Sequence, residues 1–315
     1  RRRFRSVVRF CEPLYRERIR ELFLGYRPDV IVSVHPLLNH AALRARSDAE
    51  MEGVPVITVV TDLGRVHEGW LVPEVDAIVV PAPEVYKRAR ARGIPASRIY
   101  QLGHPVHPKF EDQSETKLEV RKRLGLPGDA TVALLMAGGE GDGKLLPTTL
   151  ALARARLPLH LMVVTGRNAA LRTKLDELAP SLPTPMTILG YCDNMPALMR
   201  ASDLLVTKAG PGTIAEASLA EVPVVVYDFI PGQERGNLDY VRNHGIGVVA
   251  LTTGDVVRSV RRIVANLERL ETMRDCQASV APRGSSRRIA ELIASIAFGL
   301  PSTFHPRRLP TAAAL

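Results

Sequence analysis

The sequence predicts a protein of the α/β class built around parallel sheets, and three observations support this prediction. Apolar runs of strand length alternate with helical patterns along most of the 315 residues. Several of these runs are followed directly by glycine-rich loops, as happens at the carboxyl edge of a parallel sheet. The alternation pauses after residue 103 and restarts near residue 131, which indicates two domains.

The first domain is expected over residues 1–110. Its predicted strands are residues 30–34, 56–60 and 77–80, and its predicted helices include residues 38–52 and 84–92. The run at 56–60 is apolar at nearly every position, as expected for a strand that is covered on both faces.

A hinge is expected over residues 103–108 and 111–116, where proline and charged residues are frequent. The second domain is then expected over residues 111–298, and residues 299–315 are expected to form a loose tail. The predicted strands of the second domain are residues 131–136, 160–165, 186–189, 204–207 and 222–227, and residues 285–297 form a predicted closing helix.

The composition excludes several classes of protein. Only 5% of the residues are aromatic, with one Trp, so stacking platforms for single-stranded nucleic acid are scarce and nucleic acid is not an expected partner. Three widely spaced residues, Cys11, Cys192 and Cys276, form no CxxC pair, so neither a disulfide framework nor a structural metal is expected. The net charge of +9 favours anionic partners such as phosphorylated small molecules or an acidic membrane surface.

No apolar run reaches the roughly 20 residues that a membrane-spanning helix needs. If a membrane is involved, we therefore expect peripheral attachment, at the cytosolic face or at a plastid or other organelle membrane. The chain opens with Arg1 rather than Met and has no long apolar segment behind it, so it is expected to begin as a fragment does.

The segment KAGPGTIAEA at residues 208–217 carries the strongest functional signal. It follows a predicted strand and opens a helix, so backbone amides at Gly210 and Gly212 can approach an anion at the positive end of the helix dipole. Lys208 begins this segment, Thr213 can cap the helix or donate to a phosphate, and Glu216 can accept the two hydroxyls of a ribose. A tight strand-to-helix turn with a normally capped helix is the alternative.

Two further loops follow predicted strands of the second domain. The first contains Gly138, Gly139, Glu140 and Gly141, and it is not a Walker A loop because no GK[ST] follows. The second, at residues 230–237, places amide, carboxylate and guanidinium groups around two glycines, a set suited to sugar hydroxyls and a diphosphate. For each loop, a purely steric or solvated turn is the alternative.

In the first half, residues 61–70 follow a buried strand and contain Asp62, His67 and the single Trp. His67 is a candidate general base or a polar clamp on an acceptor, and Asp62 is a second candidate for this chemistry. Both side chains can equally serve to satisfy loop amides. His35 and His40 also lie near a strand end, and a structural role is the alternative for both.

Taken together, these motifs resemble the monogalactosyldiacylglycerol synthases, which belong with the diacylglycerol glucosyltransferases in glycosyltransferase family 28. The resemblance is carried, in order, by the segments SVHP (33–36), VTDL (60–63), GGEG (138–141), GRN (166–168), KAGPGTIAEA (208–217) and PGQERGN (231–237).

The resemblance implies a GT-B fold, with two Rossmann-like domains facing across a cleft, and inverting transfer of a hexose from UDP-galactose or UDP-glucose to diacylglycerol. It implies no cofactor and no active-site metal, since the UDP-sugar is the donor substrate. Carried over by position, the diphosphate would lie on Gly210, Pro211, Gly212 and Thr213, the ribose on Glu216, and the donor sugar against Gln233 and Glu234 with Asn237 nearby. The uracil would lie beside Gly190, Tyr191 and Cys192 above Met195, with Gly166, Arg167 and Asn168 close to the nucleotide.

One departure from the family pattern is that the sequence lacks the opening strand and the glycine-rich loop ending in His, so the N-terminal domain is expected to be incomplete. Two alternatives therefore stand beside the enzyme. The chain could be a non-catalytic UDP-sugar-binding fragment or pseudoenzyme, or it could be a UDP-GlcNAc transferase acting on a polyprenyl lipid.

Overall fold

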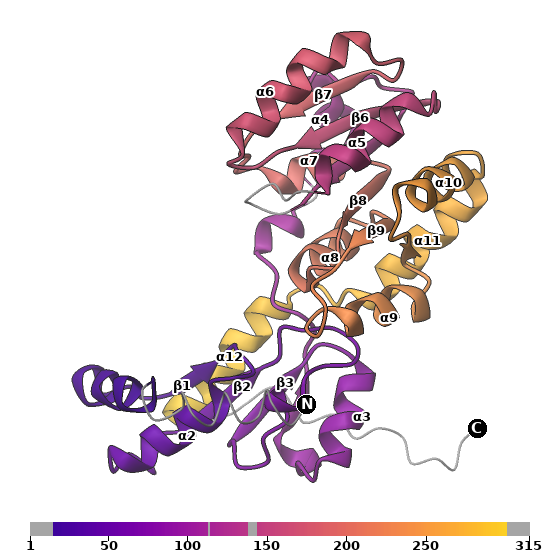
Figure 1. Ribbon diagram of the computed structural model, residues 1–315. Coiled ribbons are helices and arrows are strands. Elements are labelled where there is room, and N and C mark those ends of the chain that lie inside the picture. Colours follow the sequence, from indigo (N-terminus) through magenta and orange to yellow (C-terminus); the bar gives the residue numbers. More distant parts are fainter. Residues whose placement is uncertain (1–14, 113, 138–143, 301–315) are drawn as a thin grey trace, which may run out of the picture. The chain divides into compact units, whose positions relative to one another are not determined.

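The computed structural model describes residues 15–112, 114–137 and 144–300 and divides them between two compact units (Figure 1). The first unit joins residues up to Pro105 with residues from Gly284 onward, and the second unit is Val106–Arg283. Each unit contains one sheet in which every strand pairing is parallel. The α/β class and the parallel sheets predicted from the sequence are therefore confirmed.

The first unit holds a four-stranded sheet in the order β1-β2-β3-β4. Its strands are β1 (Ile31–Ser33), β2 (Val56–Val59), β3 (Ala77–Val80) and β4 (Ile99–Gln101). Its helices are residues 15–26, α2 (Asn39–Asp48), α3 (Pro83–Ala91) and α12 (Ser285–Phe298), with short 3-10 turns η1 (Glu68–Trp70) and η2 (Ala96–Arg98).

Both faces of the first sheet are covered, which explains the continuous apolar runs of its central strands. Val56, Val60 and Ile78 face a core shared with α2 and α3, whereas Ile57 and Val79 on the opposite face pack with α12. Alternate residues of a strand point to opposite faces, so a strand covered on both sides is apolar at every position.

Helix α12 corrects the predicted domain boundaries. The sequence prediction assigned residues 111–298 to the second domain, but α12 belongs to the first unit because Ile289 and Leu292 cover one face of its sheet. The chain passes from the first unit to the second after Pro105, whereas the predicted boundary was residue 110. The predicted tail after residue 300 lies outside the described residues.

The second unit holds a six-stranded sheet in the order β10-β9-β8-β5-β6-β7. Its strands are β5 (Thr131–Met136), β6 (Leu159–Val164), β7 (Met186–Leu189), β8 (Leu204–Lys208), β9 (Val224–Asp228) and β10 (Gly247–Val249). Its helices are α4 (Lys117–Arg123), α5 (Leu145–Arg154), α6 (Ala169–Leu178), α7 (Met195–Ala201), α8 (Pro211–Leu219), α9 (Arg235–Asn243), α10 (Thr253–Val264) and α11 (Leu267–Val280), with short turns η3 (Pro108–Phe110) and η4 (Ala179–Ser181).

The strand order reverses direction at β5, which determines where a ligand can bind. After β5 the chain builds β6 and β7 on one side, and it then crosses to build β8, β9 and β10 on the other side. The loops that leave β5 and β8 therefore diverge from neighbouring strands, and the crevice between such loops is where open α/β sheets bind ligands.

The Asp203 carboxylate organises the opposite, amino edge of this sheet. It lies just before β8 and pairs with the ammonium of Lys117, with Arg121 at 2.5 Å and with Arg274 at 2.8 Å, and it also accepts from the Val132 amide at 2.8 Å. Burial raises the pKa of this carboxyl, but the charges and hydrogen bonds of Lys117, Val132 and Arg121 more than offset this, so the pKa is lowered. One carboxylate thus ties α4 and α11 to β5 and β8.

Asp203→Asn is expected to destabilise the protein by about 3 kcal/mol at pH 7, because the buried Arg121 guanidinium loses its counter-charge. The exposed Asp129→Asn in the same unit is the matched control, with an expected change below about 0.5 kcal/mol. Urea unfolding measures both changes. Because the folded pKa of Asp203 is lowered, the difference between wild type and variant should shrink as the pH falls below about 4. Equal stability of the two variants at pH 7 would show that this cluster contributes nothing.

Candidate functional site

The carboxyl edge of the second sheet gathers most of the residues that the sequence singled out. Because all strands of this sheet are parallel, the loops after β5, β6, β7, β8 and β9 leave from the same edge. The predicted segments at residues 166–168, 190–195, 208–216 and 233–237 follow β6, β7, β8 and β9 respectively. Gly138, Gly139, Glu140 and Gly141, predicted after β5, lie outside the described residues.

Two hydrogen bonds fix the main chain of Ala209, one on each side of its Cα atom, at the exit of β8. Its amide donates to the carbonyl of Asp228 at 2.8 Å, and its carbonyl accepts from the Asn237 side chain at 2.9 Å. Asn237 is 1% exposed, so this bond is protected from water. The sequence placed Asn237 near a donor sugar, whereas the structure shows it holding the loop that starts α8.

The N-terminus of α8 is open to an anion. Gly210 is the N-cap residue and Pro211 the first helical residue, and no described side chain caps this helix. Thr213 was predicted to cap the helix or to donate to a phosphate; its hydroxyl makes no capping bond, and the second role stays a prediction. The amides of Gly212 and Thr213 lie in the first turn, where helical N–H groups have no partner within the helix. Since the first turn also contains no acidic residue, this end of α8 keeps its positive character.

Glu216 lies one turn further along α8, and within the described residues its carboxylate has no hydrogen-bond or ion-pair partner. Burial raises the pKa of this carboxyl to about 7, so in the empty protein it is divided between its charged and neutral forms near neutral pH. A half-buried carboxylate without a partner can be stabilised by hydroxyl donors. This fits the ribose-binding role that the resemblance implies.

The loop after β9 is closed by its own side chains. The carboxylate of Glu234 accepts from the amide of Ile230 at 2.7 Å, and Glu234 is 6% exposed. The Oε2 atom of this carboxylate is engaged within the turn, and its predicted contact with a donor sugar stays a prediction. Gln233 is exposed in the same turn and remains a candidate for sugar contact.

The ends of β6 and β7 bring two predicted nucleotide-binding residues into contact. The Arg167 guanidinium lies 4.9 Å from the ring centre of Tyr191, which is a cation–π distance. Both side chains are exposed, so the Tyr191 ring and the Arg167 plane can also receive a flat base. Gly166 has the left-handed φ of 62° that lets the chain turn sharply there.

Other predicted residues at this end of the sheet have local structural roles. Asn168 caps α6 by accepting from the Leu171 amide at 2.9 Å, which positions Arg167 beside it. Met195 is the first residue of α7 and is half-buried. The Cys192 thiol donates to the Gly190 carbonyl at 3.6 Å, and burial raises the pKa of this thiol, so it is a poor nucleophile.

In the first unit, the loop after β2 contains the predicted acceptor-side residues. Asp62 is 6% exposed and accepts from the Trp70 indole at 2.8 Å. The Nδ1 atom of His67 accepts from the Gly69 amide at 3.0 Å and caps η1. A neutral His67 with Nδ1 as acceptor carries its proton on Nε2, so it can donate to an acceptor molecule more readily than it can remove a proton.

Two residues that the sequence analysis did not single out hold this loop in place. Asn39 donates to the Gly69 carbonyl at 2.7 Å and accepts from the hydroxyl of Thr58 at 3.0 Å. The Nε2 atom of His104 lies 3.0 Å from the carbonyl oxygen of Thr61. Burial lowers the pKa of His104, although its contacts with backbone carbonyls and the charge of Asp62 oppose this shift.

His35 also has a structural contact, because its Nδ1 atom accepts from the Leu37 amide at 3.3 Å. His40 is exposed on α2. In residues 15–112, 114–137 and 144–300, no three His, Cys, Asp or Glu side chains come together as a group that could hold a metal ion. Within the same ranges, no helix has the length and apolar character needed to cross a membrane.

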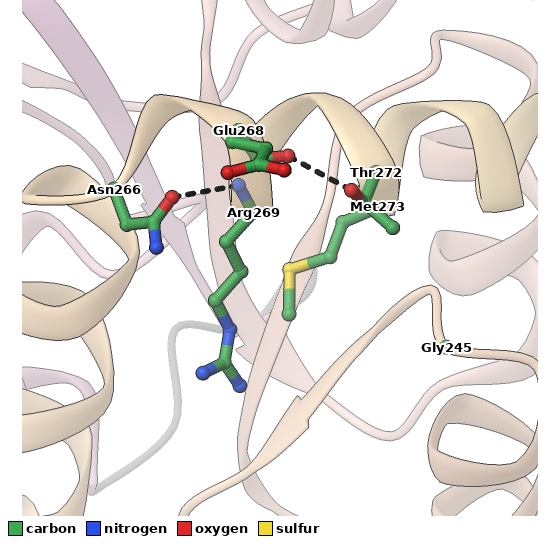
Figure 2. Close-up of a pocket in the computed structure, with 6 residues that line it drawn as sticks. All are labelled: Gly245, Asn266, Glu268, Arg269, Thr272 and Met273. Carbon is green, nitrogen blue, oxygen red and sulfur yellow. Dashed lines mark hydrogen bonds between the residues drawn. The ribbon is translucent and has the colours of Figure 1, made fainter.

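A pocket of about 450 Å³ lies elsewhere in the second unit, at the start of α11. Figure 2 shows that the Asn266 side chain accepts from the Arg269 amide and the Thr272 hydroxyl donates to the Glu268 carbonyl, contacts that belong to the helix itself. Gly245 on its rim precedes β10, so the pocket lies toward the amino edge of the sheet. It contains no residue predicted to bind the nucleotide.

Two family models match the chain. Residues 3–106 match the model described as monogalactosyldiacylglycerol (MGDG) synthase, and residues 143–290 match the glycosyltransferase family 28 C-terminal domain. The second match contains every described residue of the carboxyl-edge site. The predicted loop residues Gly138, Gly139, Glu140 and Gly141 precede it.

The curated relatives of the chain are named for the same family as the first model. The chain is 40% identical over 247 residues to the probable monogalactosyldiacylglycerol synthase 2, chloroplastic, of Oryza sativa subsp. indica, covering 76% of this chain and 52% of the relative. It is 37% identical over 245 residues to monogalactosyldiacylglycerol synthase 1, chloroplastic, of Arabidopsis thaliana, covering 75% and 46%. The chain thus spans about half the length of the curated relatives it matches.

Solved structures support the fold. The crystal structure of MurG from Acinetobacter baumannii matches with a TM-score of 0.67 at 16% identity, covering 88% of this chain and 76% of that one. The UDP-GlcNAc 2-epimerase from Neisseria meningitidis, solved with UDP-GlcNAc, matches with a TM-score of 0.66 at 15% identity, covering 91% and 82%. At these identities the likeness shows the fold alone.

The fold and the matched C-terminal domain define the class of the chain as GT-B glycosyltransferases of family 28. Within that class, the chain belongs to the monogalactosyldiacylglycerol synthase family.

Gly69→Ala tests how tightly the loop after β2 is packed. A Cβ atom at Gly69 would lie 2.4 Å from the carbonyl oxygen of Pro36, so the loop must shift, and we expect a loss of about 1–3 kcal/mol of stability. Gly53→Ala is the control, because nothing lies within 4 Å of its added Cβ. Thermal unfolding of both variants measures the difference, and equal melting temperatures would contradict the close packing described above.

Proposed function

We propose that this chain carries the donor and acceptor surfaces of an inverting glycosyltransferase that moves galactose or glucose from a UDP-sugar to diacylglycerol at a membrane surface. The observation that carries the proposal is the open N-terminus of α8, fixed by Asn237 and followed by Glu216, whose carboxylate has no partner among the described residues. This arrangement lies inside the region that matches the family 28 C-terminal domain.

The donor nucleotide would lie along the carboxyl edge of the second sheet. In this proposal the amides of Gly212 and Thr213 and the dipole of α8 take up charge from the diphosphate, and Lys208 lies at the preceding strand end. Glu216 would accept the ribose hydroxyls, and the exposed Tyr191 ring with Arg167 would lie beside the uracil. Gln233 would contact the sugar from the loop after β9.

The reaction would be a single displacement. The hydroxyl oxygen of diacylglycerol attacks the anomeric carbon, the bond from that carbon to the UDP oxygen breaks, and UDP leaves as an anion. The hydroxyl proton needs an acceptor, and Oδ1 of Asp62 is the candidate. The indole of Trp70 donates to Oδ2 of the same carboxylate. His67 would hold the acceptor by donating from Nε2, because its Nδ1 already accepts from Gly69.

Three observations support the proposal that the protein acts while attached to a membrane surface. The curated relatives are named as chloroplastic proteins, so we propose a peripheral position on a plastid membrane, or on a comparable membrane elsewhere. The net charge of +9 suits an anionic lipid surface. In the first unit, Leu22, Leu24, Tyr26 and Val34 are between 44% and 81% exposed, and such apolar side chains can enter the headgroup region.

The affinity for UDP is expected to rise about tenfold between pH 6 and pH 8. The empty site holds Glu216 with a pKa of about 7, and ribose hydroxyls bind best to its ionised form, so binding lowers this pKa and acid opposes binding. Isothermal calorimetry with UDP measures the slope. Glu216→Gln should bind UDP more weakly at pH 8 and should keep only the pH dependence of UDP itself. An identical slope in both proteins would remove Glu216 from the ribose site.

Transfer to diacylglycerol tests the acceptor-side roles. In an active preparation, Asp62→Asn is expected to lower kcat about 100-fold or more, because the proton acceptor is lost. His67→Gln should raise KM for diacylglycerol with a smaller effect on kcat, because its amide can still donate. Unchanged turnover in Asp62→Asn would exclude the base role. UDP binding without any transfer by the wild type would point instead to a donor-binding protein without activity.

A further inference from the structure

An ion pair lies at the carboxyl edge of the second sheet beside the proposed donor site. The ammonium of Lys144 lies 2.6 Å from Oδ1 of Asp228. The Lys144 side chain is 57% exposed, while that of Asp228 is only 18% exposed. Lys144 directly precedes α5, and Asp228 ends β9, so the pair joins the loops of two strands that flank β8.

The pair is held next to the first turn of α8. In the sheet Asp228 is the partner of Lys208, and the Asp228 carbonyl accepts the amide of Ala209, the residue before the N-cap of α8. The main chain of Asp228 therefore helps to fix α8, whereas its side chain is engaged with Lys144. These are separate functions of one residue, and substitution of the side chain leaves the main-chain bond in place.

The charges of the pair act in opposite directions on a diphosphate. The Asp228 carboxylate is a fixed, mostly buried negative charge, and without a counter-charge it would repel an anion bound at the start of α8. The Lys144 ammonium would attract the same anion, and its flexible four-carbon stem with a mostly exposed end allows it to change partners.

We propose that Lys144 is a phosphate-binding residue of the donor site, held on Asp228 until a nucleoside diphosphate binds. The ligand competes with Asp228 for the ammonium, so Asp228 keeps the empty site neutral and weakens the binding of the product UDP. This inference rests on the proposed function, because it assumes that the diphosphate lies at the N-terminus of α8.

The alternative is that the pair only joins two loops. An ion pair of that kind contributes little, so the loss of either partner would disturb the loops slightly and weaken UDP binding by a small and similar amount. The two interpretations therefore differ in the expected UDP affinity of Asp228→Asn, which the alternative lowers and the proposal does not.

The experiment measures the dissociation constants of UDP and uridine by calorimetry for the full chain and three variants. Lys144→Met is expected to bind UDP about 5- to 20-fold more weakly and to bind uridine as the wild type does, because only the diphosphate contacts the ammonium. Asp228→Asn is expected to bind UDP as tightly as the wild type or more tightly. Lys174→Met removes an exposed lysine of α6 and serves as the control for the loss of one positive charge.

Each outcome decides the proposal. Weaker UDP binding in Lys144→Met alone, with unchanged uridine binding, supports it. Weaker UDP binding in Asp228→Asn, equal losses for UDP and uridine in Lys144→Met, or a loss in Lys144→Met no larger than in Lys174→Met overturns it. If the wild type binds UDP in a Glu216-dependent way while Lys144→Met is unchanged, only this inference fails. If the wild type binds no UDP, the proposed function fails with it.

Discussion

The two hydrogen bonds that fix the main chain of Ala209 are the constraint on which the donor side depends. A helix N-terminus can bind an anion only if its amides already point to the place where the anion arrives. Here the amide of Ala209 is bound to β9 and its carbonyl to α9, so the loop cannot turn away from the edge of the sheet. The polar groups of this loop are occupied by these contacts, and the first turn of α8 is left for a ligand.

Most of the fold could be predicted because long apolar runs specify buried parallel strands. The predicted strands at residues 77–80, 131–136 and 186–189 agree with β3, β5 and β7 at both ends. The strands β4 and β10 were not predicted, and each is three residues long at the edge of its sheet, whereas the equally short edge strand β1 lies within the longer apolar run at residues 30–34. A run of three residues is too short to show a period of two.

The location of the donor site could also be predicted, whereas the contacts of individual side chains could not. Glycine-rich segments after strands mark the carboxyl edge, and the structure places those it describes along one edge. Glu234 and Asn237 belong to the expected segment, yet their polar atoms are bonded to their own turn and to Ala209. Such bonds join residues that are far apart or that turn back on themselves, and a one-dimensional pattern does not contain that geometry. His104 was missed because its segment was interpreted as a hinge, although its imidazole reaches the Thr61 carbonyl.

The return of α12 to the first unit has a consequence for biosynthesis. Residues 106–283 form one uninterrupted stretch, so the second unit has its complete sequence while the chain is still being translated. The first unit does not, because the helix that covers Ile57 and Val79 is translated about 180 residues after β4, the last strand of its sheet. Until α12 emerges from the ribosome, one apolar face of that sheet is bare, and it is a surface on which a chaperone can act. The domain that is synthesised first is thus the one that finishes folding last.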